Sequence, residues 1–556
     1  EMRKIDDLES QLIPKLLELV NYAHDKNVEI TIDAEEQDRL SISLHIIEKL
    51  AFEKKIKDWP GFGLALQAYG KRSHDVIFWM NSILKKREMM HLRLVEGAYW
   101  DYEIKHAQVN GYQGYPVFSK KSLTDISFLS CAKHILQNNK IYAKFATHNA
   151  HTIASINHLA KDKNYEFQRL FGMGELLYQS AEKVLKINKK PSIYAPIGNY
   201  KDLLPYLVRR LLENGANSSF INRLLDSDTD SYWLAENPLL RLEKESKDIP
   251  LPSKIFKDRK NSSGFDFSEQ NNLSILKSKL QSFEGKKTKA ESVYCGRDDH
   301  ASSKKDVISI SNNTNIGTVT FDNLEKIKIS LENFNDSKWS KYDVNKRSKI
   351  LNIIADEIEK DPYEILYLLE NEAGKTITNA VDEIREAIDF LRYYSNQIGQ
   401  INTRVNLSGP TGEENNFTYN ERGRFLCISP WNFPVAILIG QISAALACGN
   451  TVVLKPAETT SLTALKFCEL LQDIGLPDGV VNIVTGAAKT GEYLVQHPDI
   501  DKIAFTGSTG VGKVIQQSIA ERQLPATFEL GGKGAFILFD DAAINEAVEG
   551  IVNAIF

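Results

Sequence analysis

Short apolar strands alternate with amphipathic helices along the chain, and no other sequence feature limits the possible folds as strongly. In the first half, strand-like segments lie at residues 28–34, 63–69, 91–99, 141–149, 165–172 and 192–198, each followed by a stretch with helical character. Repeated strand–helix units predict a parallel sheet, and a long series of them predicts a (β/α)8 barrel. Because only six such strands are visible, we expect the barrel to be incomplete, with about two more strands before Glu1.

The second half repeats the alternation after a change of character. Residues 243–305 are charged, serine-rich and weakly periodic, which predicts a linker or arm. Residues 322–397 have mainly helical patterns, and buried-strand patterns then follow at 424–430, 450–456, 480–486, 502–508 and 534–540. This order predicts an α/β domain of the doubly wound type. The expected domains are therefore 1–242, 243–305 and 306–556.

Composition excludes several classes of protein. Of 556 residues, 42% are hydrophobic and 25% are charged, as in globular proteins with an ample core. Lys and Arg number 68 against 73 Asp and Glu, a net charge of −5, which gives no electrostatic reason to expect nucleic acid as a partner. The most apolar run, 433–449, is interrupted by Gln441 and is short for a bilayer span of about 20 residues.

The cysteines and the chain ends indicate where such a protein works. Five cysteines show no C-x-x-C spacing, which favours a reduced compartment and a cytoplasmic location. The chain opens without a methionine and stops at Phe556 inside a helical pattern. We therefore expect a piece of a longer protein.

The stretch "FTGSTGVGKV", residues 505–514, has the glycine and lysine spacing of a phosphate-binding loop. Such a loop needs Ser or Thr directly after the lysine, because that hydroxyl binds Mg²⁺. Val514 occupies this position and cannot bind a metal. An ATPase is therefore disfavoured, and the glycines are expected to serve another cofactor.

Polar residues gather where the strands of the first half end. They are Asp33, Gln67, Arg93, Tyr99, Thr147, His148 and Tyr194. In (β/α)8 barrels the carboxyl ends of the strands carry the active site. On the helix after the last strand, Tyr206, Arg209, Arg210 and Glu213 fall on nearby faces, and an arginine pair can clamp a carboxylate. His148 and His151 lack the further ligands that a metal site would need.

The strings "DAEEQDRL", "RLVEGAYWD", "FATHNAH", "YEFQRLFGMGE" and "IYAPIGNYKDLLPYLVRRLLENGANSSFINR" together resemble the proline dehydrogenase barrel of the bifunctional proline utilisation A flavoenzymes. The resemblance runs from about Val28 to Arg223. It implies FAD across the strand ends, with Arg93 near flavin N5. The implied cofactor contacts are Gln67, Arg93, Gly97, Trp100, Lys121, Thr147, His148 and Glu213. The family also uses a lysine on an earlier strand, which this chain does not contain.

The same resemblance implies how proline is held. Tyr194, Tyr206, Arg209 and Arg210 match residues that bind proline, with the two arginines on its carboxylate. Asp33 and Tyr99 match polar residues near the flavin ring and the substrate. This agrees with the chemistry, since hydride transfer to a flavin requires the ring carbon of the amino acid to be held against N5.

In the second half, "SPWNFP", "LKPAETT", "GLPDGVVNIVTG", "FTGSTGVGK" and "FELGGK" resemble the aldehyde dehydrogenase superfamily. The resemblance implies NAD, with Lys455 and Glu458 at the adenosine ribose and with Gly507, Ser508 and Gly512 in the turn and helix at the pyrophosphate. Asn432 matches the donor to the oxyanion and Glu529 the general base. The nucleophilic cysteine is expected beyond Phe556, so Cys427, Cys448 and Cys468 are interpreted as core thiols.

Both resemblances together predict a bifunctional oxidoreductase of proline catabolism. It would oxidise proline to pyrroline-5-carboxylate with FAD and then glutamate semialdehyde to glutamate with NAD. A homo-oligomer is expected, and a quinone-type electron acceptor and peripheral association with the inner membrane are left open. The alternative from another class is a non-catalytic flavoprotein scaffold or a DNA-binding regulator.

Overall fold

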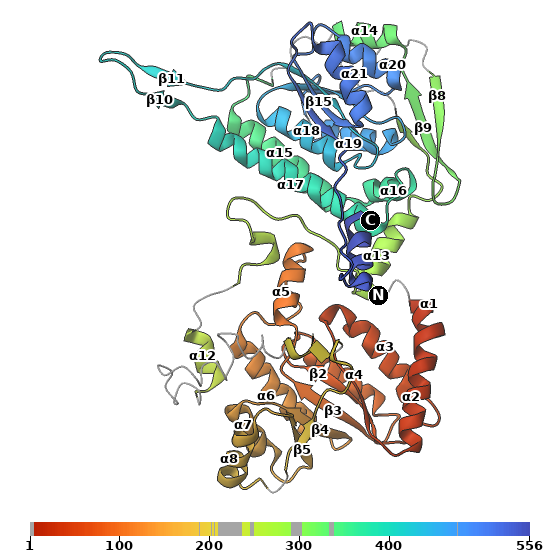
Figure 1. Ribbon diagram of the computed structural model, residues 1–556, viewed down its shortest axis with the longest axis vertical. Coiled ribbons are helices and arrows are strands. Elements are labelled where there is room, and N and C mark those ends of the chain that lie inside the picture. Colours follow the sequence, from red (N-terminus) through yellow and green to blue (C-terminus); the bar gives the residue numbers. More distant parts are fainter. Residues whose placement is uncertain are drawn as a thin grey trace. The chain divides into compact units, whose positions relative to one another are not determined.

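The computed structural model describes residues 5–187, 190–201, 203–204, 206–208, 236–244, 249–290, 303–332, 339–474 and 476–555. The chain divides into two compact units, Glu1–Ser278 and Lys279–Phe556, shown in Figure 1. The boundary between them falls inside the segment for which a linker or arm is predicted. The described part of that segment includes regular elements at 252–254, 270–281 and 288–290.

The first unit is built on one parallel sheet whose six strands follow one another in chain order. The strands are β1 (Ile30–Ile32), β2 (Phe62–Gln67), β3 (Met90–Val95), β4 (Ile141–Ala146), β5 (Tyr165–Leu170) and β6 (Ser192–Tyr194). Sequential order with helical crossovers is the arrangement of a (β/α)8 barrel. The predicted fold class of this half is confirmed, as a curled, partial barrel.

The two faces of this sheet differ in polarity. Leu64, Leu92 and Phe145 point to the face covered by helices and are buried in the main core of the unit. The opposite face carries buried polar residues, among them His91 and Lys144. Because side chains alternate along a strand, every second residue of β2 to β4 points to this polar face.

Helices and helical turns precede, connect and follow the six strands in this half of the chain (Figure 1). They are α1 (Ile5–Asp7), a π-helical turn (Leu8–Leu12), α2 (Ile13–Asp25), a 3₁₀ turn (Gln37–Arg39), α3 (Leu40–Ala51), α4 (Ser73–Ile83), α5 (Trp100–Val109), α6 (Lys121–Gln137), α7 (Ala150–Ala160), α8 (Glu175–Leu185), α12 (Pro238–Lys244), a 3₁₀ turn (Pro252–Lys254) and α13 (Gln270–Gln281). Asn149 caps α7 by accepting the backbone N–H groups of His151 and Thr152.

The second unit contains a five-stranded parallel sheet with the strand order β14-β13-β12-β15-β16. The strands are β12 (Arg424–Ile428), β13 (Thr451–Lys455), β14 (Val481–Ile483), β15 (Lys502–Gly507) and β16 (Ala526–Leu530). The chain runs outward in one direction from β12 and in the other direction from β15. This is the doubly wound order that the sequence predicts, and its switch point lies between β12 and β15.

Smaller elements surround this sheet (Figure 1). A three-stranded sheet contains β7 (Thr288–Ala290), β9 (Asn315–Phe321) and β8 (Ser303–Ile308), and β10 (Val405–Leu407) pairs with β11 (Asn415–Phe417) in an extended hairpin. The helices are α14 (Leu324–Glu332), α15 (Val344–Lys360), α16 (Tyr363–Asn371), α17 (Ile377–Ile401), α18 (Ala436–Ala447), α19 (Ser461–Asp473), α20 (Ala488–Gln496), α21 (Thr509–Ile519) and α22 (Ile544–Ile555). No described helix is both long and apolar enough to cross a bilayer.

One predicted strand is wrong. Residues 534–540 have no regular secondary structure, and the fifth strand of the sheet is β16, which lies just before them. Phe536 and Ile537 are largely exposed, at 55% and 71%. An apolar run becomes a strand only when a neighbouring strand accepts its hydrogen bonds, and no described strand pairs with this run.

Candidate functional site

Three of the predicted site residues meet at the carboxyl ends of β1, β3 and β6. Asp33 directly follows β1, and its carboxylate forms an ion pair with Arg93 on β3. The guanidinium of Arg93 also lies 6.0 Å from the ring centre of Tyr194 on β6. The Arg93 side chain remains 22% exposed. A partly accessible cation therefore lies at the carboxyl ends of the strands, where (β/α)8 barrels carry their active sites.

Gln67 at the end of β2 joins two neighbouring loops. Its Nε2 donates to the carbonyl oxygen of Glu35 at 2.7 Å, and its Oε1 accepts from the backbone N–H of Ala98 at 3.0 Å. Tyr99 donates its hydroxyl to Glu35 Oε2 at 3.1 Å. Glu35 belongs to residues 33–37, which we call the β1 turn. Gln67 and Tyr99 therefore hold the β1 turn against the loop after β3.

Gly97 makes a bend that a side chain would prevent. Its φ is +142°, and a Cβ atom there would come within 2.3 Å of the Tyr69 ring. The following residues carry two more predicted site residues, Tyr99 and Trp100. The Trp100 indole donates to the Phe118 carbonyl at 2.9 Å while its side chain stays partly exposed. Gly97 thus allows the close backbone approach that positions both aromatic residues.

Lys121, at the start of α6, is held by acidic groups of the protein itself. Its Nζ lies 3.1 Å from Glu96 Oε2 and also pairs with Asp125. Asp125 in turn pairs with Arg241 on α12 at 3.2 Å. Burial opposes the charge, but the two carboxylates outweigh it and raise the pKa of Lys121. Lys121 therefore remains a cation at neutral pH.

Thr147 and His148 follow β4 and are fixed by neighbouring elements. The Thr147 carbonyl accepts the Tyr178 hydroxyl at 2.8 Å, and His148 Nε2 accepts the backbone N–H of Leu170 at 3.3 Å. A neutral His148 therefore carries its proton on Nδ1. Burial, with Arg241 nearby, lowers the pKa of His151. Among the residues described, no cluster of His, Cys, Asp and Glu could hold a metal ion.

The predicted arginine clamp cannot be placed. Tyr206 lies in a helical stretch and is half-buried. Arg209, Arg210 and Glu213 lie outside the described residues. Their assignment therefore stays a prediction.

A buried carboxylate that the sequence reasoning missed adjoins this set. Glu103 on α5 is 2% exposed, and its Oε1 accepts the backbone N–H of Gln37 at 2.7 Å and the Tyr69 hydroxyl at 3.3 Å. Burial raises the pKa of Glu103 to about 7. Glu103 shares the buried side of α5 with Ile104 and Ala107. Helical periodicity could therefore have identified Glu103, because an acidic residue on an apolar helix face needs a hydrogen-bond partner.

The second candidate site lies at the carboxyl edge of the five-stranded sheet. Asn432 lies in the exposed turn between β12 and α18. Glu383 on α17 holds the end of this turn, because its Oε1 accepts the N–H groups of Val435 at 2.7 Å and Ala436 at 3.2 Å. Lys375 pairs with Glu383 at 2.9 Å. The sequence analysis did not identify Glu383 as this support. Its signal would have been an acidic residue on the buried face of α17.

Lys455 is the last residue of β13, and Glu458 lies three residues after it. Lys455 is 8% exposed, and its Nζ donates to the Pro456 carbonyl at 3.0 Å. Burial lowers the pKa of Lys455, and Glu458 partly offsets that effect. Glu458 itself is exposed. Its carboxylate is therefore accessible to a ligand hydroxyl.

The glycine run forms the turn from β15 into α21. Ser508 is the N-cap of α21, and its hydroxyl accepts the backbone N–H of Val511. No atom lies within 4 Å of a Cβ added at Gly510, so ligand could approach the backbone there. Gly512 has a different role: it is buried, and a Cβ there would come 2.7 Å from Leu530 Cδ2. Gly512 therefore serves helix–strand packing.

The position of Lys513 explains why this turn differs from a phosphate-binding loop. Helix α21 begins at Thr509, so Lys513 already lies in the helix rather than in the loop before it. Both Lys513 and Val514 are exposed on that helix. A phosphate-binding loop uses its lysine at the helix start, where it reaches the phosphates.

Glu529 lies on β16 in register with Thr506 of β15. Its side chain is exposed. Thr506 accepts a hydrogen bond from Gln441 Nε2 at 3.0 Å.

Of the cysteines interpreted as core thiols, Cys427 is buried and Cys448 is exposed, so that interpretation is wrong for Cys448.

Comparison with known proteins matches both halves of the chain. The family model described as proline dehydrogenase covers residues 3–223, and the one described as aldehyde dehydrogenase family covers residues 298–556. The bifunctional protein PutA of Salmonella typhimurium is 39% identical over 98% of this chain and 42% of its own length. That of Rhizobium meliloti is 36% identical over 98% of this chain and 45% of its own length.

Solved structures agree with these relatives. Proline utilization A from Bdellovibrio bacteriovorus, inactivated by N-propargylglycine, matches with a TM-score of 0.89 and 29% identity over 99% of this chain and 58% of that one. A variant of proline utilization A from Bradyrhizobium japonicum matches with a TM-score of 0.84 and 37% identity over 95% of this chain and 52% of that one. This chain spans less than half the length of the curated relatives. It belongs to the bifunctional proline utilization A family, with a proline dehydrogenase region followed by an aldehyde dehydrogenase region.

Proposed function

We propose that the full-length protein oxidises proline to pyrroline-5-carboxylate at the first site and glutamate semialdehyde to glutamate at the second. The observation that carries the first assignment is the convergence of Asp33, Arg93 and Tyr194 at the strand ends. In a barrel of this family, that edge is where substrate and cofactor bind. Membership of the family supports the second activity.

The residues at the first site fit a flavin. Arg93 offers a partly accessible guanidinium to an electron-rich ring atom, and Trp100 offers a partly exposed aromatic face. Thr147 and His148 follow the next strand, β4. FAD, when bound, supplies the hydride acceptor. Arg93, Trp100, Thr147 and His148 would bind and orient it.

The protein's part in proline oxidation is to orient the substrate. We propose that Arg209 and Arg210 bind the proline carboxylate, with Tyr194 and Tyr206 beside the substrate ring. Such a clamp fixes the reacting carbon and so lowers the entropic part of the barrier. Asp33 keeps Arg93 in place through their ion pair.

The second site fits NAD. The N-terminus of α21 and the open space at Gly510 suit a pyrophosphate, and the exposed Glu458 suits a ribose hydroxyl. NAD, when bound, supplies the hydride acceptor. We propose that Asn432 donates its amide to the oxyanion formed from the aldehyde and that Glu529 activates the hydrolytic water.

Purified full-length protein should contain flavin, and its visible absorbance should bleach when proline is added without oxygen. The reason is that proline reduces the flavin directly. Absorbance spectra before and after addition measure both steps. Protein without flavin, or flavin that proline does not bleach, would contradict the first activity.

Changing Arg209 or Arg210 to Met should raise the KM for proline by roughly tenfold to a hundredfold. Each change removes a charge-assisted hydrogen bond worth about 1.5–3 kcal/mol, while Met keeps most of the side-chain volume. Steady-state kinetics at saturating acceptor provide the values. An unchanged KM in both variants would rule out the clamp.

The second site should prefer NAD to NADP because Glu458 would repel a 2′-phosphate. Glu458→Gln keeps the shape and removes the charge, so it should narrow the difference in kcat/KM between the two cofactors. Glu492→Gln on α20 is a control for loss of a surface charge. Equal efficiency with both cofactors in the unaltered protein would refute the assignment of Glu458.

A further inference from the structure

The β1 turn carries Asp33 and is attached to the rest of the barrel by polar contacts. Asp33 pairs with Arg93, and Glu35 is held by Gln67 and Tyr99. These contacts come from Gln67 at the end of β2, from Arg93 within β3 and from Tyr99 after β3. They fix the first part of the turn.

The last part of the turn is attached at Gln37. Its backbone N–H donates to Glu103 Oε1 at 2.7 Å, and its carbonyl oxygen accepts from Arg72 Nη2 at 3.1 Å. Glu103 also accepts the hydroxyl of Tyr69 at 3.3 Å. Arg72 is tied in addition to Glu269 at 2.7 Å. The Glu103 carboxylate on α5 therefore connects the β1 turn to Tyr69, the residue whose ring lies against Gly97.

The surroundings of Glu103 make this contact costly to lose. Glu103 is almost fully buried, so Gln37 and Tyr69 would leave a buried donor each without an acceptor if it were removed. The acidic residues Glu36 and Asp38 flank Gln37, and together with burial they raise the pKa of Glu103 to about 7. The pKa of Asp38 is also raised, mainly by burial.

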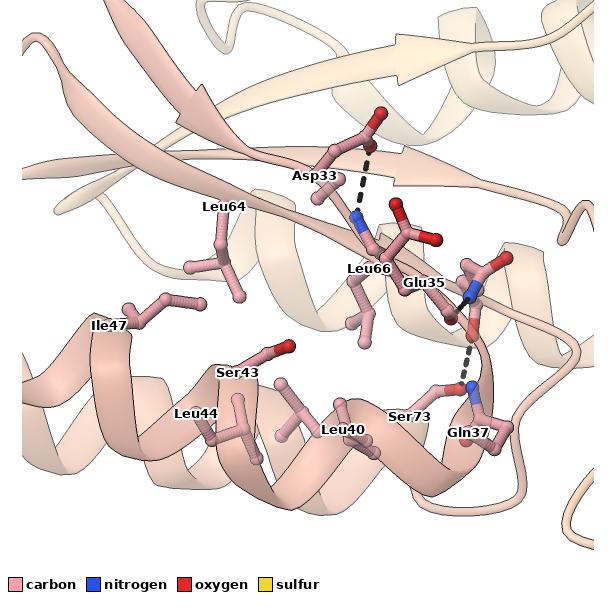
Figure 2. Close-up of a pocket in the computed structure, with 14 residues that line it drawn as sticks. Asp33, Glu35, Gln37, Leu40, Ser43, Leu44, Ile47, Leu64, Leu66 and Ser73 are labelled. Atoms are coloured by element: carbon pink, nitrogen blue, oxygen red, sulfur yellow. Dashed lines mark hydrogen bonds between the residues drawn. The ribbon is translucent and has the colours of Figure 1, made fainter. Parts of the chain in front are cut away.

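Packing beneath the turn is incomplete. A cavity of about 20 Å³ lies between the β1 turn and helices α3 and α4, and Figure 2 shows its lining. This is room for about one water molecule. Apolar side chains form part of its lining, among them those of Leu40, Leu44, Leu64 and Leu66. The turn therefore has a small gap below it, and its polar contacts contribute to holding its position.

We propose that Glu103 is a positioning residue for proline oxidation: through the Gln37 N–H and the Tyr69 hydroxyl it holds the β1 turn, and with it Asp33, in register with Arg93. This inference rests on the proposed proline dehydrogenase function. In this role Glu103 contacts neither substrate nor flavin. It acts on the geometry of the residues that do.

Glu103→Leu and Glu103→Gln separate positioning from charge. Leu removes the acceptor, so the KM for proline should rise about tenfold and the protein should retain less flavin after dialysis. Gln keeps an oxygen that can accept the Gln37 N–H, so it should stay within about threefold of the unaltered protein. If only the negative charge of Glu103 mattered, Glu103→Gln would raise the KM as much as Glu103→Leu does. A KM close to that of the unaltered protein in Glu103→Gln would therefore show that the acceptor oxygen is what matters.

A second variant breaks the same contact from the other side. Gln37 is the first residue of a 3₁₀ turn, and Glu36 before it has φ −57° and ψ 154°, which suits a following proline. Gln37→Pro therefore suits the conformation of Glu36 and deletes the N–H that Glu103 accepts. It also removes the buried Gln37 side chain, so Gln37→Ala is the control for that loss. When this change is combined with Glu103→Leu, the KM should rise little further, because Glu103→Leu already removes the contact that Gln37→Pro deletes.

Glu372, the C-cap residue of α16, provides a matched control in the other unit. It is 3% exposed, burial raises its pKa to about 7, and it accepts the N–H groups of Leu462 and Thr463. Glu372→Leu should lower the melting temperature as Glu103→Leu does, but leave flavin content and the KM for proline unchanged.

The outcomes are distinct. Bleaching of the unaltered protein by proline tests the proposed function, and its failure would remove the basis of both proposals. If bleaching occurs and Glu103→Leu changes the KM no more than Glu372→Leu does, the positioning role is wrong. Additive effects of Glu103→Leu and Gln37→Pro would also overturn it. If Glu103→Leu does not fold, Gln37→Pro alone decides, and an unchanged KM there refutes the proposal.

Discussion

Changing Glu383 to Ala should destabilise the second unit by about 3–5 kcal/mol, the cost of breaking a buried ion pair on one side. The Glu383 side chain is fully buried and that of Lys375 is 13% exposed. Without the carboxylate, Lys375 loses the ion pair with Glu383. The N–H groups of Val435 and Ala436, at the start of α18, lose their acceptor as well. The turn that carries Asn432 should therefore loosen.

Differential scanning calorimetry of the full-length protein measures this effect. A loss of this size corresponds to a fall on the order of 10 °C in the melting temperature of a unit this large. Glu364→Ala is the matched control, because Glu364 pairs with Lys466 at the same 2.9 Å but both side chains are 30% exposed. That pair should contribute no more than about 1 kcal/mol. Equal shifts in the two variants would show that Glu383 does not hold the turn.

Changing Gly97 to Ala should destabilise the first unit and impair flavin binding. At φ +142° the backbone is in a region that side chains avoid, and the new Cβ would lie 2.3 Å from the Tyr69 ring. Tyr69 is 2% exposed and cannot move aside without disturbing its contact with Glu103. Backbone strain and overpacking each cost about 1–3 kcal/mol.

Gly172→Ala separates the two costs. Gly172 has φ +79°, but no atom lies within 4 Å of an added Cβ. This control should therefore lose only the strain of the left-handed backbone, about 1–2 kcal/mol. Flavin content and melting temperature of both variants are the measurements. If Gly97→Ala retains flavin and melts no lower than Gly172→Ala, the close approach to Tyr69 does not position the loop after β3.

Local patterns were enough to predict the class of both sheets. Alternating strands and helices require helical crossovers between strands, and such crossovers produce parallel sheets. For this reason β1 to β6 could be expected from the sequence, and so could the placement of Asp33, Arg93 and Tyr194 at one sheet edge. Ser508 could likewise be placed at the start of a helix, because a serine before a helical pattern is a frequent N-cap.

Other features depend on partners that are distant in the sequence. Residues 534–540 have the composition of a strand, but composition does not supply the neighbouring strand that would pair with them. Glu103 contacts Gln37, and Glu383 contacts Val435, although the two residues of each pair are far apart in the sequence. A local pattern shows only that the two glutamates lie on apolar helix faces. The sequence by itself determined the order of elements and which chemical groups stand at strand ends, because these depend on local periodicity. Only the tertiary structure decided which buried carboxylates hold those groups in place, because hydrogen-bond partners are set by the packing of whole elements.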